Sequence, residues 1–504
     1  MLLSIKYILA SFIFLLIFIL TIVNKFFKNK EFYKKAALLP GPRIIPLLGN
    51  IHLFFRIKSN FMNTVYEMYD SYPSVFRLWI FNFLLVVIYD PKTIKVALES
   101  SKLCEKPKFY KYFELCAGKG IFTADVPVWR MHRKLMLPAI KTLHKSTEVF
   151  QKHSVIVLKY LSIMANGEEF HLANVTFTYV LNTLLEAIVG EDVFLELEMK
   201  ENYATFMEKG VDSASYKILT SMLKTTEETK MINTNDQPMY NFLKNIVHQR
   251  RKLIIQNDNR RIRNTFLDLL LERTFNENEL TEEDVWEEIK AIISAAIHTT
   301  PLTAAFALRI MASLPEIQSK ARREIDKIFD DADDEGRKIS NEDLFKMDYL
   351  DRVIKETMRL FPGAPTICRT VTEDFNTGEH ILPKGSTLFI PIFHIHRIEK
   401  FWPNPLKFDP DRFLPNEIAN RPSISYLPFS SGLRNCIGNK FSSAALKMLL
   451  SMVLRNYRLE CNDKTPIGRI KVEDRTLLKP LTPLKIKIKK FNYDYDQGPL
   501  VKRN

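Results

Sequence analysis

The sequence of 504 residues contains only five cysteines, and it has no internal repeat, no low-complexity tract and no linker rich in glycine and serine. The cysteines are odd in number and widely spaced, at Cys104, Cys116, Cys368, Cys436 and Cys461. This pattern argues against a disulfide framework and agrees with free thiols plus one ligand cysteine in a reducing compartment. Apolar residues make up 46% of the chain and are spread evenly from about Pro40 onward, so one large domain is the simplest organisation.

Two further absences limit the function. No Gly-x-Gly-x-x-Gly segment joins a strand to a helix, so nicotinamide and flavin cofactors are expected on a separate protein. The basic run from His248 to Lys252, continued by Arg260, Arg261 and Arg263, has no interleaved aromatic side chains, so we predict the solvated face of a helix and no nucleic-acid partner. The net charge of +14 instead suits an anionic lipid surface or an acidic partner protein.

An apolar run near the N-terminus, Tyr7 to Val23, is interrupted only by Ser11 and Thr21. At about 1.5 Å per residue a helix of this length roughly spans a hydrocarbon core with its flanking residues. A cluster of lysines follows it and no small-x-small cleavage site does, which favours an uncleaved anchor over a signal peptide or a buried helix. The excess of lysines on the C-terminal side places the rest of the chain in the cytoplasm.

A proline-rich connector follows this segment, with Leu39-Pro40-Gly41-Pro42 and Pro46-Leu47-Leu48-Gly49-Asn50, and no helix could cross it. We therefore divide the chain into an anchor (1–24), a basic and proline-rich linker (25–50) and one large folded domain (51–504).

The most informative segment is Phe429-Ser430-Ser431-Gly432-Leu433-Arg434-Asn435-Cys436-Ile437-Gly438. Gly432 allows a tight turn, and Gly438 removes side-chain bulk so that backbone N–H groups can point at the sulfur of Cys436. Phe429 can shield that sulfur, and Arg434 is placed to reach an anionic carboxylate. A helical segment from Asn439 to about Leu454 follows, with its positive end beside the cysteine. The loop is therefore suited to present a thiolate to a metal.

The spacing Phe-x-x-Gly-x-Arg-x-Cys-x-Gly resembles the haem-ligand loop of the cytochromes P450. The resemblance runs from the apolar N-terminal segment to the strand-like residues 483–489. It implies a mainly α fold with a small β-rich region, preceded by one transmembrane helix, and it makes Cys436 the ligand of the haem iron. It also matches the proline-rich connector to the hinge of microsomal members, and thus implies an endoplasmic reticulum membrane protein.

The same resemblance assigns two further groups of residues. Trp129 and Arg133, at i and i+4 of a predicted helix, match contacts to the haem propionates, as do Arg369 and Arg434. Glu356, Arg359 and Arg412 match a buried charge network behind the haem loop. On its own, the Glu356–Arg359 spacing carries little information, because an exposed pair contributes only a few tenths of a kcal/mol.

A long helix is predicted from Thr281 to about Ala312, and it starts with a capping-box pattern. Pro301 cannot donate to the carbonyl of Ile297, so we expect a kink or an opening there. The segment resembles the family's oxygen-binding helix, with Thr299 at the position of the catalytic threonine. The preceding residue is His298, where the family usually has an acid; it could relay protons or be a packed core histidine.

These features predict a haem-thiolate monooxygenase that inserts one oxygen atom into a C–H bond of a lipophilic substrate. Thr123-Ala124-Asp125 leading into Trp129, and Pro138-Ala139-Ile140, most resemble the fatty-acid ω-hydroxylase branch, and terpenoids, hydrocarbons and xenobiotics stay open as substrates. Ala295 occupies the position where some members of that branch bind haem through a glutamate, so we expect non-covalent haem b. The expected partners are an NADPH–cytochrome reductase, cytochrome b5 and membrane lipid. Two alternatives remain: an isomerase or dehydratase acting on a peroxide, and a non-catalytic haem- or ligand-binding protein.

Overall fold

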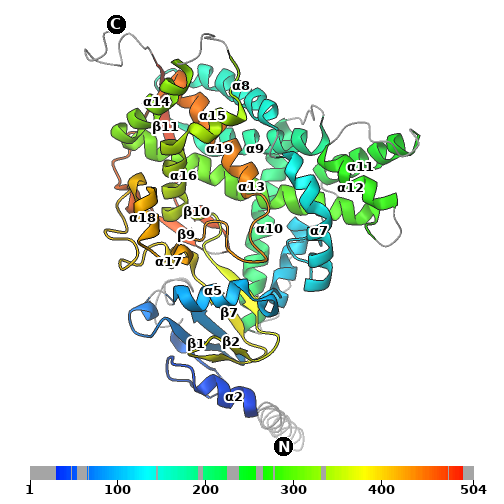
Figure 1. Cartoon of the computed structure of the whole chain (residues 1–504), viewed down its shortest axis with the longest axis vertical. Helices are drawn as coiled ribbons and strands as arrows, with labels where there is room; N and C mark the ends of the chain where they lie inside the picture. The colour runs from blue at the N-terminus through cyan, green and yellow to red at the C-terminus, as the bar shows by residue number, and fades with distance from the viewer. Residues whose placement is uncertain are drawn as a thin grey trace, which may run out of the picture. The chain divides into compact units, whose positions relative to one another are not determined.

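The computed structural model describes residues 30–46, 48–53, 65, 67–143, 146–190, 197–223, 238–256, 265–275, 279–330, 337–474 and 476–491. The predicted anchor lies outside these residues. The described chain is mainly helical with small sheets and divides into two compact units (Figure 1). The smaller unit contains Met1–Glu105 and Cys368–Ile390, and the larger contains Lys106–Ile367 and Pro391–Asn504.

A four-stranded sheet forms the smaller unit, in the order β1-β2-β7-β4. Strand β1 pairs antiparallel with β2, and β2 pairs parallel with β7. The strands are rich in branched and aromatic side chains, most of which are buried. The described elements of this unit are α2 (Lys30–Ala37), β1 (Val75–Ile80), β2 (Phe83–Ile88), α5 (Pro91–Glu99), η1 (Ser101–Leu103), β4 (Ile367–Thr370), β5 (Phe375–Asn376), β6 (Ile381–Leu382) and β7 (Thr387–Ile390).

The larger unit is built mainly from helices. Its described helices are η2 (Lys108–Phe113), α6 (Glu114–Ala117), α7 (Val126–Leu143), α8 (Thr147–Met164), α9 (Leu172–Val189), α10 (Leu197–Leu223), α11 (Pro238–Gln256), α12 (Phe266–Glu272), η3 (Arg273–Phe275), α13 (Glu282–Ser313), α14 (Pro315–Asp330), α15 (Asn341–Lys346), α16 (Asp348–Leu360), α17 (Ile392–Ile395), η4 (Pro410–Phe413), α18 (Pro415–Ala419), η5 (Ser423–Ser425), α19 (Asn439–Asn456) and η6 (Ile467–Arg469).

Helix α13 lies in the middle of this unit and contacts α9, α16 and α19 (Figure 1). It starts as predicted, because the Thr281 side chain accepts from the N–H of Asp284 while the Asp284 carboxylate accepts from the N–H of Thr281. It also continues through Pro301 to Ser313, so the opening expected at the proline does not divide the helix. The predicted helices before Pro362 and after Gly438 are present as α16 and α19.

Two small sheets complete the unit. One has the order β3-β11-β8, and the other is the hairpin of β9 and β10. Their strands are β3 (Phe170–His171), β8 (Tyr457–Glu460), β9 (Val472–Asp474), β10 (Leu478–Pro480) and β11 (Lys485–Lys490). Strand β11 confirms the strand predicted near the C-terminus.

The basic run in α11 is exposed at His248 and Lys252, as predicted, but the prediction for Arg250 needs a correction; Arg260, Arg261 and Arg263 lie outside the described residues. Arg250 is not on a solvated face, since it is 5% exposed and its Nε donates to Oδ1 of Asp268 at 2.7 Å. Asp268 follows Thr265 in a capping box at the start of α12, so the ion pair joins two helices. The sequence could not show this partner, because the pair is made in three dimensions.

Among the described helices, α9 and α13 are long and apolar enough to cross a membrane. Two thirds of each apolar window is buried inside the protein, so packing in the core explains their composition.

Candidate functional site

Cys436 lies in a tight loop that ends where α19 begins. The backbone N–H of Cys436 donates to the carbonyl oxygen of Phe429 at 3.0 Å and closes the loop. Gly432 has a φ angle of 72°, a left-handed conformation that glycine adopts without steric cost. The turn therefore requires the glycine that the sequence provides, and the start of α19 brings positive helix-dipole potential to the cysteine.

Cys436 is exposed, whereas the other four cysteines are buried. Protein atoms around the Cys436 side chain partly desolvate its thiol, and this desolvation raises the pKa of the thiol. A hydrogen bond from the backbone N–H of Gly438 and the charge of Arg133 oppose that rise. Cys436 is therefore open to a ligand, and its thiolate has two stabilising partners.

Two arginines and a tryptophan surround this loop. Arg133 on α7 donates through Nη1 to the carbonyl oxygen of Asn435 at 2.9 Å, and through Nη2 to the Asn435 side chain. Arg434 donates through Nη2 to the carbonyl oxygen of Ala124 at 2.6 Å. Its guanidinium carbon lies 4.6 Å from the centre of the Trp129 ring. The structure thus brings Trp129, Arg133 and Arg434 together at the loop that carries the cysteine.

Arg369, the remaining predicted arginine, belongs to the smaller unit. It is 4% exposed, and its Nη1 donates to the carbonyl oxygen of Cys368 at 2.8 Å. Its assignment to the propionates stays a prediction.

The middle of α13 has an accessible face, although most of the helix is buried. Ala295 is exposed and Thr299 partly exposed, while the neighbouring Ser294 and Ile297 are buried. Residues four apart share one face of a helix, and Thr299 Oγ1 donates to the carbonyl oxygen of Ala295 at 3.1 Å. Thr300 Oγ1 lies 3.1 Å from Oγ of Ser442 on α19, so the helix with this face packs on the helix that follows the cysteine loop.

The His298 ring lies in a different environment from Thr299. Burial lowers the pKa of His298 to about 4, a shift that the charges of Glu208 and Asp212 oppose and that of Lys479 enhances. Its Nε2 atom is buried and makes no hydrogen bond to any described residue. His298 is therefore neutral near pH 7, and it lies within the electrostatic reach of α10 and β10.

Glu356 and Arg359 form a fully buried ion pair, each side chain being 0% exposed. Arg359 Nε lies 2.7 Å from one oxygen of Glu356 and Nη2 lies 2.9 Å from the other. Arg412 Nε lies 3.5 Å from Glu356 Oε1, and the N–H of Asp409 donates to the same oxygen at 2.9 Å. The three charged residues that the resemblance grouped therefore do lie together.

Comparison with known proteins agrees with this geometry. A sequence model described as "Cytochrome P450" matches residues 39–488. The chain belongs to the cytochrome P450 family. Similar relatives include the probable cytochrome P450 4s3 of Drosophila melanogaster, 31% identical over 444 residues that cover 84% of this chain and 86% of the relative. Cytochrome P450 4V2 of Homo sapiens is 29% identical over 478 residues, 90% of this chain and 89% of the relative.

These relatives identify a cytochrome P450 of the family 4 type, and hence a haem-thiolate monooxygenase. Probable cytochrome P450 4aa1 of Drosophila melanogaster matches at 29% identity over 90% of both chains. Haem as the cofactor, a redox partner and a lipophilic substrate follow from membership of the P450 family.

One buried pair of side chains, which includes the residue before Arg133 in the sequence, was not predicted. His132 on α7 is 4% exposed and Glu288 on α13 is 0% exposed, and the two side chains contact each other. The only hint in the sequence was Glu288 itself, a carboxylate on the largely apolar helix α13. The pairing needs α7 and α13 to be packed together, which no local pattern predicts.

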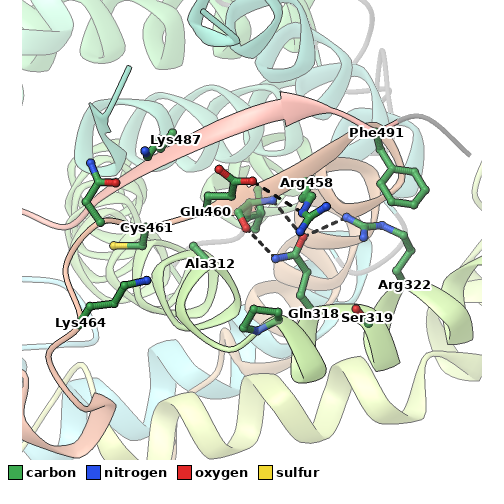
Figure 2. A pocket seen from close by; sticks show the side chains of 13 residues that line it. Ala312, Gln318, Ser319, Arg322, Arg458, Glu460, Cys461, Lys464, Lys487 and Phe491 are labelled. Carbon is green, nitrogen blue, oxygen red and sulfur yellow. Dashed lines mark hydrogen bonds and ion pairs between the residues drawn. The ribbon is translucent and has the colours of Figure 1, made fainter. Parts of the chain in front are cut away.

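A pocket away from this P450 site lies between the start of α14 and strands β8 and β11 (Figure 2). It is lined by polar and charged side chains, including Gln318, Arg458, Glu460 and Lys487. Its lining includes neither Cys436 nor Thr299, and its polarity does not suit a lipophilic substrate.

Proposed function

We propose that Cys436 supplies the thiolate ligand of a non-covalent haem b, and that the enzyme uses it to hydroxylate a lipophilic substrate. The exposed Cys436, whose thiolate is favoured by the Gly438 N–H and the Arg133 charge, is the observation that carries this proposal. A single soft sulfur donor between arginines fits an iron porphyrin with two carboxylates. Ala295 favours non-covalent binding, because a methyl side chain cannot form an ester.

Trp129, Arg133, Arg369 and Arg434 are the proposed contacts of the haem propionates. Their guanidinium groups suit carboxylates, and Arg133 and Arg434 are fixed by hydrogen bonds to backbone carbonyls of the loop and of Ala124. Phe429, Gly432 and Gly438 shape the loop around the sulfur. When bound, a haem with a thiolate ligand activates dioxygen by favouring heterolytic O–O cleavage.

Thr299 and His298 are the proposed polar residues of oxygen activation. Thr299 has a hydroxyl on the accessible face of α13, where it can hold a water or a proton. Because burial lowers its pKa to about 4, His298 holds no extra proton near pH 7, and its proposed role is that of a neutral hydrogen-bonding link in the proton route. Its Nε2 has no hydrogen-bond partner among the described residues.

The resemblance to the fatty-acid ω-hydroxylase branch supports the proposed substrate class, and the exposed Ala295 on α13 agrees with an apolar ligand. A fatty acid is the first candidate, with terpenoids, hydrocarbons and xenobiotics as further candidates. Electrons would come from an NADPH–cytochrome reductase, and cytochrome b5 would be a second donor. We place residues 1–24 in the endoplasmic reticulum membrane, residues 25–50 in a linker and residues 51–504 in the cytoplasm.

The test is a reduced carbon monoxide spectrum of the purified full-length chain, followed by NADPH consumption with purified reductase over a panel of lipids. A red-shifted band and substrate-dependent NADPH use are expected. Turnover of a lipid hydroperoxide without reductase would instead favour the isomerase alternative, and haem binding without turnover of any kind would favour a non-catalytic protein.

Deletion of Met1 to Asn24 should weaken membrane retention without removing haem. The apolar run of this segment is separate in sequence from every proposed haem contact. The measurement is the haem content and the carbonate-resistant membrane fraction of the truncated and full-length chains. Loss of haem from the truncated chain would show that the anchor is not a separable element.

His298→Ala should lower the ratio of product to NADPH and divert electrons to peroxide, whereas His298→Asp should keep or raise that ratio. Since burial lowers the pKa of His298 to about 4, the parent's ratio should not titrate with His298 across about pH 6 to 8.

A matched control for His298 is His153→Ala, which removes another buried histidine, paired with Glu186 on α9 at 2.8 Å. At equal haem content the control should lose stability and keep its coupling. Unchanged coupling in His298→Ala would end the relay hypothesis and leave Thr299 and water as the proton route.

A further inference from the structure

Glu288 lies on α13 and holds two other elements with its two carboxylate oxygens. Oε1 lies 2.7 Å from Nδ1 of His132 on α7, and Oε2 accepts a hydrogen bond from the backbone N–H of Ile121 at 2.9 Å. The side chain of Glu288 is 0% exposed. A buried carboxylate is stable only if its oxygens are paired, so its position fixes α7 and the segment before it relative to α13.

The segment that Ile121 belongs to is packed closely against α13. A methyl group at Gly120 would lie 2.6 Å from the carbonyl oxygen of Glu287, so no larger residue fits without a shift. Glu287 accepts a further hydrogen bond from the backbone N–H of Lys119 at 2.5 Å. Glu287 and Glu288, which are successive residues of α13, therefore both bind the segment from 118 to 124. Glu288 also binds α7, the helix that follows this segment.

Both elements held by Glu288 lead directly to the cysteine loop. Three residues after Ile121, the carbonyl oxygen of Ala124 accepts from Arg434. One residue after His132, Arg133 donates to the carbonyl oxygen of Asn435, next to Cys436. Arg133 thus lies on the helix that Glu288 holds, and Arg434 is bound to the segment that Glu288 holds.

We propose that Glu288 and His132 are positioning residues for haem, which act by fixing Arg133 and Arg434 at the Cys436 loop. The inference rests on the proposed function, in which these arginines contact the propionates. Loss of the pair would leave the arginines chemically intact but free to shift, so haem should dissociate faster.

A purely structural role is the competing explanation, and a second buried pair in the chain provides the control for it. Arg250 and Asp268 are 5% and 0% exposed and 2.7 Å apart, which resembles the exposure and distance of the His132–Glu288 pair. They join α11 to α12 through hydrogen bonds between their own side chains. Breaking this pair should destabilise the fold without a specific effect on haem.

The experiment compares Glu288→Gln, His132→Phe, His132→Asn and Arg250→Met in the full-length holoprotein. Haem dissociation is measured by transfer to excess apomyoglobin, and global stability by thermal unfolding. We expect Glu288→Gln and His132→Phe to raise the dissociation rate by about tenfold or more, the range of a hydrogen bond to a buried charge. His132→Asn should restore slow dissociation, because its side-chain N–H can replace Nδ1–H of histidine.

The control Arg250→Met should lower the unfolding temperature and leave the haem dissociation rate near that of the parent. If Arg250→Met speeds haem loss as much as Glu288→Gln at a matched unfolding temperature, the His132–Glu288 pair has only a structural role. Unchanged dissociation in Glu288→Gln and His132→Phe would also overturn the proposal. A parent chain that binds no haem would instead refute the proposed function itself.

Discussion

Cys436→Ser is expected to abolish the red-shifted carbon monoxide band of the reduced protein. A serine hydroxyl does not ionise near neutral pH, so it cannot supply the electron density that a thiolate gives to iron. The Gly438 N–H and the Arg133 charge, which favour the thiolate, would then have no anion to stabilise. The measurement is the difference spectrum of the reduced protein with and without carbon monoxide, at equal haem content.

Cys116→Ser is the matched control for this substitution. Burial raises the pKa of the Cys116 thiol to about 11, and that of Cys368 to about 12, so neither forms a thiolate readily. The control should keep the band. A band that persists in Cys436→Ser, or one that disappears in Cys116→Ser, would contradict the assignment of the ligand.

The cysteine loop could be predicted from the sequence because its structure is local. The turn at Gly432, the hydrogen bond from Cys436 to Phe429 and the start of α19 all lie within a few residues of one another. The N-terminal cap of α13 and the end of α16 before Pro362 were predictable for the same reason. In each case one residue type satisfies a backbone requirement of its neighbours.

Contacts between distant segments could not be derived in this way. The grouping of Glu356 with Arg412 came from resemblance, because the two residues are far apart in the sequence. The i, i+3 spacing of Glu356 and Arg359 does not show whether that pair is buried. His132 with Glu288, and Arg250 with Asp268, were missed because each pair depends on how two helices pack. The environment of His298 was equally hidden, because its charged neighbours come from α10 and β10.

Glu356→Ala is expected to yield almost no haem-loaded protein. Removing this carboxylate strands Arg359, a fully buried charge, which costs roughly 3–5 kcal/mol. That is a large fraction of the total stability of a typical domain, roughly 5–15 kcal/mol. The measurement is the haem content and the soluble yield of the variant relative to the parent.

The ion pair with Arg359 does not fully offset the free-energy cost of burying the Glu356 carboxylate. Burial raises the pKa of Glu356, although Arg359, the N–H of Asp409 and Arg412 oppose the shift. The charged form therefore pays a desolvation cost that its partners do not fully offset. Replacing one partner is still damaging, because the other partner stays buried without its counter-charge.

The same reasoning ranks the neighbouring substitutions. Arg412→Ala should be milder than Glu356→Ala, because Glu356 keeps both hydrogen bonds from Arg359 and the one from the N–H of Asp409. Asp348→Ala, on the same helix α16, is the matched control, since its side chain is 75% exposed and its pair with Arg352 should contribute about 1 kcal/mol or less. Normal haem content in Glu356→Ala would show that the stranded arginine finds water or another anion, and that the network does not hold the fold behind the cysteine loop.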